Sequence, residues 1–289
     1  MATPTFPLAE SVERLAVLDE PGQAVGERVR ELIGPGPLKD AISGTWLGHA
    51  LHPLLTDVTI GSFISATLLD LLGGDDDGRA AQRLIAIGLA SYGPTALTGV
   101  SDWADTEITD EKVRRVGLVH AATNAVAATC FASSLVARRR GRRGRGKLLG
   151  LAGAAALSAA GYLGAHMSYV QGVGPNQTAF DQVPDGWMAV IAAGDLELGQ
   201  AGTALVGDAP VLLVRHEHGI HALHDRCSHR GCLLSDGELD GESVVCACHG
   251  SRFALGDGSV ERGPATASQP AFETREREGQ VELRPRGSN

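Results

Sequence analysis

The sequence predicts a multidomain protein in which an all-α bundle of four transmembrane helices is followed by an all-β domain. Three observations support this fold class. Residues 46–170 contain four apolar stretches of about 20 residues or more, enough for each to cross a bilayer as a helix. From 187 to 285 the chain changes to short β-prone runs separated by turn residues. A stretch rich in Gly and Pro, 171–186, lies between the two parts and is expected to be a linker.

The N-terminal residues 1–45 are expected to form a polar arm with short helices. Apolar residues recur at helical spacing in Leu8–Leu18 and, more weakly, in Ala24–Ile33. Pro21-Gly22 is expected to separate the two helices. Two settings fit this pattern equally well. The helices lie either on a membrane surface or in an arm that packs loosely against the rest of the protein.

The four apolar stretches make up the predicted membrane domain. They are rich in Ala, Gly, Ser and Thr, and small side chains let membrane helices approach one another closely. A soluble Ala-rich bundle is the alternative, but the helices carry almost no paired charges and the segments between them are compact and charged. A lipid bilayer is therefore the expected surrounding. The stretches are Trp46–Leu72, Ala81–Val100, Val116–Ala137 and Leu148–Val170.

The distribution of charge predicts how these helices are oriented. No Asp or Glu occurs between Glu111 and Asp181, whereas Arg138–Lys147 carries six Arg and one Lys. Because basic loops stay in the cytoplasm, we expect a multi-pass protein of the cell membrane whose β domain is extracytoplasmic. The basic residues form one Gly-interrupted run in a chain of net charge −9, which argues against nucleic acid as a partner.

Seven short runs in the β domain have the composition of strands. Turn residues such as Asp240-Gly241 and Gly256-Asp257-Gly258 separate them, and seven or more short strands indicate a small all-β domain. The runs are Val190–Ala192, Thr203–Val206, Val211–Arg215, Ile220–Leu223, Ser243–Cys246, Ser259–Glu261 and Val281–Leu283.

Cysteine and histidine alternate in two short clusters within this domain. Cys227-Ser-His229 is followed, after sixteen residues, by Cys246-Ala-Cys-His249. Each cluster contributes one thiolate and one imidazole, as expected of two loops that grip a metal centre whose ends differ in ligand softness. Zinc also binds two Cys and two His, but zinc fingers pair Cys with Cys and His with His.

The pattern resembles the signature of the Rieske iron–sulfur proteins, and the resemblance extends over residues 187–284. It implies that Cys227 and Cys246 hold one iron of a [2Fe–2S] cluster and that His229 and His249 hold the other.

The residues around the expected cluster also resemble that family. They are Gly250, Ser251, Phe253 and Pro264. By resemblance, the hydroxyl of Ser251 donates to a bridging sulfide and stabilises the reduced cluster. Members of high potential often have Tyr where this chain has Phe253. The expected midpoint potential therefore lies within the Rieske range of about −150 to +300 mV but below its top.

Two further cysteines, Cys232 and Cys248, each follow one of the ligand clusters. In the cytochrome bc-type branch of the Rieske family, Cys at these positions forms a disulfide that ties the two loops together. The resemblance implies the same disulfide here, and an extracytoplasmic setting would let it persist. Two free thiols are the alternative.

The membrane half carries polar residues that are costly in a bilayer and therefore suggest function. Its opening Gly48-His49-Ala50-Leu51-His52-Pro53 resembles an uncharacterised family of membrane domains, which brings no settled activity. The side chains expected near the outer boundary suggest a site for haem b or for a quinone. A purely structural role for them, or another metal, is the alternative. The candidates are His49, His52, Asp57, His120, Asn124 and His166.

These observations together indicate a membrane-anchored electron-transfer protein. The expected role is one-electron transfer between a quinol or another membrane redox partner and an extracytoplasmic acceptor. A redox-sensing or regulatory membrane module is the alternative. The chain is a possible oxidoreductase component, whereas an oxygenase is not expected, because no two-His, one-carboxylate motif accompanies the cluster.

Overall fold

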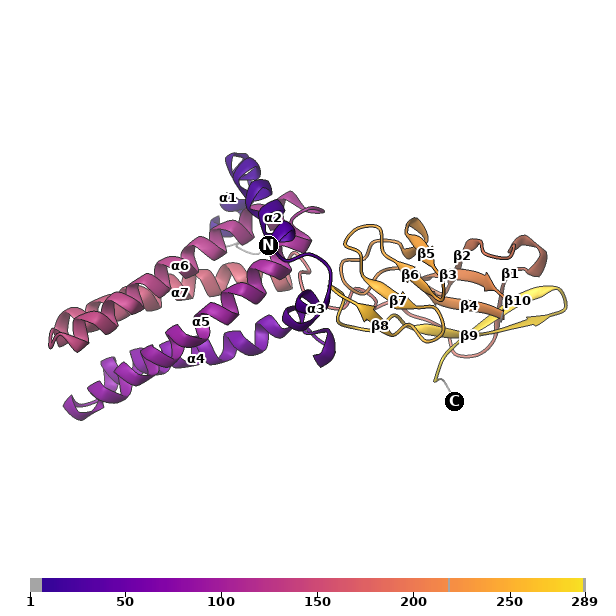
Figure 1. The fold of residues 1–289 in the computed structure, drawn as a ribbon. Coiled ribbons are helices and arrows are strands. Elements are labelled where there is room, and N and C mark those ends of the chain that lie inside the picture. Colours follow the sequence, from indigo (N-terminus) through magenta and orange to yellow (C-terminus); the bar gives the residue numbers. More distant parts are fainter. Residues whose placement is uncertain (1–6, 218, 288–289) are drawn as a thin grey trace, which may run out of the picture. The chain divides into compact units, whose positions relative to one another are not determined.

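The computed structural model describes residues 7–217 and 219–287, which form two compact units (Figure 1). The helical unit comprises 7–34 and 51–173, and the β unit comprises 35–50 and 174–287. The chain therefore passes from one unit to the other three times. The short segment 35–50 belongs to the β unit although it precedes the membrane helices in the sequence.

Among the described residues, seven α-helices precede the strands, and four of them are long and apolar enough to cross a membrane. Those four are α4 (Leu51–Leu72), α5 (Gly78–Thr106), α6 (Glu111–Arg139) and α7 (Arg143–Tyr169). The others are α1 (Pro7–Glu13), α2 (Asp19–Leu32) and α3 (Pro37–Ser43). Short 3-10 turns cover Ala16–Leu18, Thr45–Leu47 and Asp75–Asp77.

Helix boundaries differ from the sequence prediction: α5 and α6 extend beyond the predicted stretches at both ends, and α7 begins at Arg143 rather than at Leu148. The first membrane helix begins at Leu51 rather than at Trp46, because Gly48 adopts a left-handed conformation with φ 81°. The expected break at Pro21-Gly22 is absent, and α2 runs through it. Proline is tolerated in the first turn of a helix, where its missing N–H would have no partner within the helix.

The four long helices form a ring in which α4 packs along α5 and α6 along α7, while α5 also contacts α6 and α4 contacts α7. Helices α4 and α6 therefore lie on one diagonal of the bundle. Their side chains meet in its centre, where Phe63 and Phe131 stack with ring centroids 4.0 Å apart. At the far end of the same diagonal, Arg138 forms a buried ion pair with Asp70.

The N-terminal helices are fixed to the opposite end of the bundle by ion pairs. Glu107 is almost fully buried and accepts hydrogen bonds from Arg30 of α2, at 2.7 Å, and from Arg114 of α6, at 2.5 Å. Nε2 of His166 lies 2.8 Å from a carboxylate oxygen of Glu13 in α1. The expected short helices are thus present, and they pack against α5 and α6.

The β unit is built from two antiparallel sheets, in the orders β1-β10-β9-β4-β3-β2 and β5-β6-β7-β8. All seven predicted runs overlap strands, whereas β5, β7 and β9 were not predicted. The strands are β1 (Met188–Ala192), β2 (Ala201–Val206), β3 (Ala209–His216), β4 (Gly219–His224), β5 (Glu238–Asp240), β6 (Ser243–Val245), β7 (Arg252–Ala254), β8 (Val260–Arg262), β9 (Ala271–Arg277) and β10 (Gln280–Pro285).

Candidate metal centre

The two Cys–His clusters lie in loops that share one backbone hydrogen-bond pattern. The first loop follows β4, and the second connects β6 to β7. The carbonyl of Cys227 accepts from the amide of Gly231 at 2.8 Å, and that of Cys246 accepts from Gly250 at 2.9 Å. In both loops the amide of the same Cys donates to the carbonyl five residues later, at 2.8 Å. The two loops therefore present their Cys side chains from equivalent turns.

Glycine is required at the closing position of each turn. Gly231 has φ 77° and Gly250 has φ 73°, in the left-handed region that other residues rarely adopt. The carbonyl of Gly250 also accepts hydrogen bonds from the guanidinium of Arg262, at 3.2 and 3.3 Å. The sequence places Gly250 directly after the second His, so its conformation fixes where that loop turns back.

The two thiols expected to bind metal are buried side by side. Cys227 and Cys246 are each 1% exposed. A hydrogen bond between their sulfurs raises the pKa of Cys227 and lowers the pKa of Cys246 to about 6. Two sulfurs in contact, one of which ionises readily, are a suitable pair for one metal ion, because the thiolate is the form that binds metal.

The two imidazoles form a second pair. The rings of His229 and His249 lie edge to face, with centroids 4.9 Å apart. Burial lowers the pKa of His229 well below its usual value and keeps the imidazole neutral. Within the described residues, its buried Nδ1 has no hydrogen-bond partner. A neutral imidazole with an unengaged ring nitrogen is the form that ligates a metal.

This arrangement fits a two-iron cluster better than a single zinc ion. A Rieske cluster takes two Cys on one iron and two His on the other, which matches a thiol pair and an imidazole pair. A structural zinc ion needs four ligands around one point. Among residues 7–217 and 219–287, no three His, Cys, Asp or Glu side chains are grouped so as to hold one ion.

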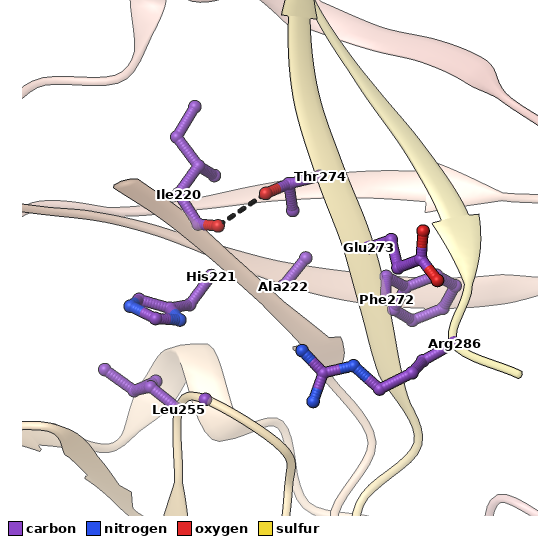
Figure 2. Close-up of a pocket in the computed structure, with 9 residues that line it drawn as sticks. Ile220, His221, Ala222, Leu255, Phe272, Glu273, Thr274 and Arg286 are labelled. Carbon is purple, nitrogen blue, oxygen red and sulfur yellow. Dashed lines mark hydrogen bonds between the residues drawn. The ribbon is translucent and has the colours of Figure 1, made fainter. Parts of the chain in front are cut away.

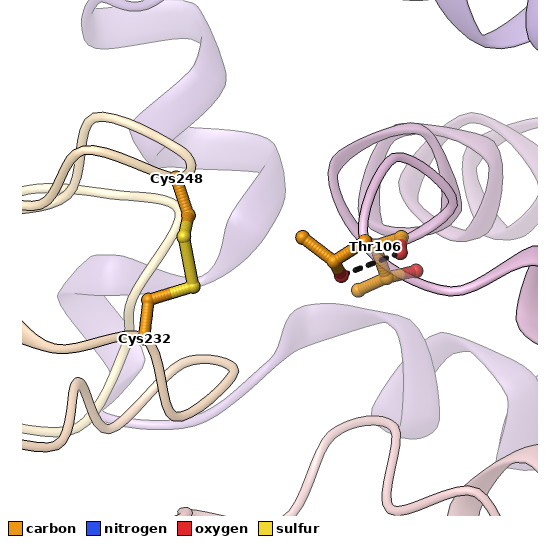
Figure 3. Close-up of a disulfide and its surroundings, with 4 residues drawn as sticks. Thr106, Cys232 and Cys248 are labelled. Carbon is orange, nitrogen blue, oxygen red and sulfur yellow. Dashed lines mark hydrogen bonds between the residues drawn. A yellow bond between two sulfur atoms is a disulfide. The ribbon is translucent and has the colours of Figure 1, made fainter.

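The predicted disulfide between Cys232 and Cys248 is confirmed. Figure 3 shows it joining the two ligand loops, with the Cα atoms 6.5 Å apart. The bond ties together loops that the sequence separates by sixteen positions. Because each pair takes one side chain from each loop, the disulfide limits how far the two thiols, and likewise the two imidazoles, can move apart.

The other residues expected around the cluster are buried in the same region. Ser251 is fully buried, and its Oγ accepts a hydrogen bond from the amide of Ala265 at 2.9 Å. Its hydroxyl proton therefore remains to be donated elsewhere. Phe253 in β7 is fully buried in the same apolar core as the two ligand cysteines. Pro264 is buried in the loop after β8.

Sequence reasoning missed the side chain that fixes the first ligand loop. Gln269 is 2% exposed, and its carbonyl oxygen accepts from the amide of Ser228 at 2.7 Å. Its amide nitrogen donates to the carbonyls of His224 and Arg226, at 2.7 and 2.8 Å. One side chain thus satisfies three backbone groups of the loop. No local pattern marks a glutamine some forty residues from its partners.

Segment 35–50 also contacts the cluster region. The amide of Gly263 donates to a carboxylate oxygen of Asp40 in α3 at 2.8 Å. Lys39 is 5% exposed, and its charge is one of the smaller causes that lower the pKa of His229. Because these residues lie more than two hundred positions from Gly263, nothing local in the sequence predicts the contact.

A pocket of about 340 Å³ opens elsewhere in the β unit, over β4 and β9 (Figure 2). Thr274 donates to the carbonyl of Ile220 at 2.6 Å on its wall. None of its lining residues is a predicted cluster ligand, so this pocket is separate from the metal centre. It is lined by Ile220, His221, Ala222, Leu255, Gly256, Phe272, Glu273, Thr274 and Arg286.

The structure separates the six membrane candidates into two groups. His49 lies in segment 35–50 and therefore in the β unit. Asp57 is exposed on the outer surface of α4, and His166 contacts Glu13 at the bundle end. The remaining three candidates, His52, His120 and Asn124, are half-buried within the bundle, and His52 lies within electrostatic range of His120.

Two family models match the chain. Residues 186–273 match the Rieske [2Fe-2S] domain, and residues 48–177 match a family described as predicted membrane protein (DUF2231). The two matches correspond to the cluster region and to the four long helices. They confirm both parts of the resemblance derived from the sequence.

Two curated relatives each match about a third of the chain. Ferredoxin CarAc of Metapseudomonas resinovorans is 34% identical over 96 residues, which are 33% of this chain and 90% of that ferredoxin. The cytochrome b6-f complex iron-sulfur subunit of Chlorobaculum tepidum is 27% identical over 94 residues, 32% of this chain and 51% of the subunit. A solved complex of reduced oxygenase and oxidized ferredoxin in carbazole 1,9a-dioxygenase contains a chain that is 33% identical, with a TM-score of 0.32, covering 34% of this chain and 92% of that chain.

Proposed function

The chain belongs to the family of Rieske [2Fe-2S] domain proteins, and we propose from this premise that it is a membrane-anchored electron-transfer protein. The observation that carries the proposal is the pair of equivalent ligand loops, joined by a disulfide, in a chain that also has four helices able to cross a membrane. Electron transfer suits such a protein because its relatives include a ferredoxin and an iron–sulfur subunit.

Four side chains would hold the cluster. Cys227 and Cys246 would bind one iron through their paired thiolates, and His229 and His249 would bind the other through neutral imidazoles. When bound, the cluster supplies reversible one-electron transfer. The Ser251 hydroxyl, held in place by the amide of Ala265, would donate its proton toward the cluster and favour the reduced state.

A quinol or another membrane redox partner is the proposed donor, and the proposed acceptor is extracytoplasmic. The Cys232–Cys248 disulfide supports the quinol-linked, cytochrome bc-type branch, although identity is higher to a ferredoxin than to the cytochrome b6-f subunit. The orientation follows from Arg138–Lys147, in which the five residues Arg139, Arg140, Arg142, Arg143 and Arg145 are exposed. Because such a run stays in the cytoplasm, the β unit would lie outside.

The membrane half would supply a site for haem b or for a quinone near its outer end. His52, His120 and Asn124 support this part of the proposal because they are half-buried in the bundle. We also propose that the chain is divided into an N-terminal arm (1–45), a membrane domain (46–170), a linker (171–186) and a Rieske domain (187–285).

Reduction of the cluster by a quinol in native membranes tests the proposal. Membranes that contain the full chain are incubated with quinol, and the reduced cluster is measured by EPR. We expect the reduced signal to form with quinol as the only donor. His249→Ala, which removes one ligand, is the control that should show no signal.

A cluster that dithionite reduces but no quinol reduces would contradict the proposed donor. A redox-sensing membrane module would then explain the chain better than an electron-transfer protein that accepts from a quinol. Cys232→Ser with Cys248→Ser provides a matched second variant, because it keeps all four ligands. We expect that variant to be reduced by quinol and to lose its cluster sooner on incubation, since the loops are no longer tied together.

A further inference from the structure

The helical unit consists of two hairpins that place the same side chains at the same positions. Hairpin α4–α5 has His52 near the start of its first helix and Phe63 eleven residues later. Hairpin α6–α7 repeats the spacing with His120 and Phe131. The first helices of both hairpins run in the same direction, because one complete hairpin precedes the other.

The second helices of the two hairpins, α5 and α7, also carry glycines at matching positions. A Cβ at Gly99 of α5 would lie 2.6 Å from the ring of His52, and a Cβ at Gly164 of α7 would lie 3.0 Å from the ring of His120. Eleven residues before each of these glycines, Gly88 and Gly153 stand in the same relation to Phe63 and Phe131, at 2.6 and 2.9 Å. Each imidazole and each phenyl ring therefore lies over a glycine of its partner helix.

The histidines face the centre of the bundle. Eleven residues are close to three helical turns and eighteen are five, so His52 lies on the same face of α4 as Phe63 and Asp70. Across the α4–α6 diagonal, Phe63 stacks on Phe131 and Asp70 pairs with Arg138. By the same spacing, His120 lies on the matching face of α6, about 27 Å from the ion pair along the helix. The two imidazoles therefore lie at the opposite end of this diagonal from the ion pair, within electrostatic range of each other.

Both imidazoles are hydrogen-bonded as metal ligands are. Nδ1 of His52 lies 3.0 Å from the carbonyl of Thr95, and Nδ1 of His120 lies 2.8 Å from that of Ala160. A carbonyl only accepts, so each Nδ1 carries the proton and each Nε2 presents a lone pair. In the structure Nε2 of His120 accepts a hydrogen bond from the amide nitrogen of Asn124 at 3.1 Å, so Asn124 must turn away before this lone pair can bind iron. Metal-bound histidines typically donate their other N–H to a carbonyl or carboxylate in this way.

We propose that His52 and His120 are the two axial ligands of a haem held on the α4–α6 diagonal. This rests on the proposed membrane redox function and commits its membrane site to haem. Two imidazoles complete the coordination of a haem iron, because the porphyrin supplies the other four nitrogens. A free transition-metal ion would need further protein ligands, and no group of three such side chains occurs among the described residues.

Haem content of the purified full chain tests the proposal. The protein is made in haem-replete cells, and haem and spin state are measured by pyridine haemochrome and EPR. We expect about one low-spin haem per chain, as for a bundle-core haem site. His52→Ala and His120→Ala should each lower haem content at least about tenfold. His49→Ala is the matched control, and it should retain the haem because His49 lies outside the helical unit.

Addition of free imidazole separates loss of a ligand from loss of the fold. Low-spin haem should return in both alanine variants, whereas an unfolded bundle would not recover it. A full chain that has its cluster but no haem would overturn the proposal, as would low-spin haem retained in both variants or a quinone bound in its place. Haem bound in a chain whose cluster no quinol reduces would remove the proposed donor and leave this inference intact.

Discussion

At the scale of single residues, buried side chains are expected to set the redox potential of the cluster and the pH dependence of the β unit's stability. Phe253 and Ser251 are fully buried beside the ligand cysteines, and only Ser251 carries a hydroxyl. Ser251 could therefore donate a hydrogen bond toward a cluster, whereas Phe253 could not. The sequence alone predicted this difference, because it depends on residue type at fixed positions of the motif.

Substitution Phe253→Tyr should raise the midpoint potential of the cluster. A hydroxyl that donates to a ligand sulfur stabilises the electron-rich reduced state. A hydrogen bond contributing about 0.5–1.5 kcal/mol corresponds to a rise of about 20–65 mV for one electron. Redox titration followed by EPR measures the shift. Phe272→Tyr, in the other apolar core of the β unit, is the control and should leave the potential unchanged. An unchanged potential in Phe253→Tyr would contradict the assigned role.

His224 should make the stability of the β unit depend on pH. It is 1% exposed, and burial lowers its pKa, although Nε2 lies 2.9 Å from the carboxylate of Asp181. A His whose pKa is lowered by folding binds more protons in the unfolded state. The free energy of unfolding should therefore fall as pH drops below about 6.5 and level off below the lowered pKa. Thermal unfolding from pH 8 to pH 5 measures this. His224→Gln should flatten the acid side of the profile, and equal slopes would refute the assignment.

At the scale of elements, the ligand loops depend on contacts from distant parts of the chain. Gln269 fixes the first loop by three hydrogen bonds, Asp40 of α3 holds the amide of Gly263, and the disulfide joins the two loops. The loops themselves are short and have no regular structure. Their geometry is therefore determined mainly by what they contact.

Removal of the Gln269 amide should destabilise the first ligand loop. Gln269→Leu leaves one buried N–H and two buried carbonyls without their partner, and we expect a loss of about 2–4 kcal/mol in unfolding free energy. Denaturant unfolding of the full chain, followed by the cluster absorbance, measures it. Gln200→Leu removes an exposed glutamine in the same unit and should change stability little. Comparable losses in both variants would show that the hydrogen bonds to the loop are not the cause.

At the scale of the whole molecule, the chain combines a helical unit and a β unit that are connected three times along the sequence. The helical unit repeats one hairpin twice, with His, Phe and a charged residue at matching positions of α4 and α6. The sequence carried a sign of this repeat, since His and Phe recur at the same spacing in both stretches. Few other positions agree, so the repeat becomes evident only when Phe63 stacks on Phe131 and Asp70 pairs with Arg138.

Orientation in the membrane can be tested with fused reporters. A reporter that is active only in the cytoplasm should be silent when fused to the C-terminus, because the exposed Arg run between α6 and α7 stays inside. The same reporter inserted after Gly141, within that run, should be active. A bright C-terminal fusion with a silent insertion at Gly141 would reverse the topology and place the cluster in the cytoplasm.

The sequence by itself determined the features that depend on residue type and local spacing. These are the four apolar helices, most of the strands, the Cys–His motif and the cysteine pair that forms the disulfide. Local patterns suffice for them because helix length, strand alternation and ligand spacing all arise within a few residues. The turn residue Gly250 also belongs here, since it lies inside the motif.

Only the tertiary structure decided which distant residues meet. It assigned segment 35–50 to the β unit, placed Asp40 on Gly263, buried Arg138 against Asp70 and paired His166 with Glu13. The physical reason is that each contact joins side chains far apart in the chain. Such pairs depend on how packed helices and sheets align, and no periodicity of the sequence encodes that alignment.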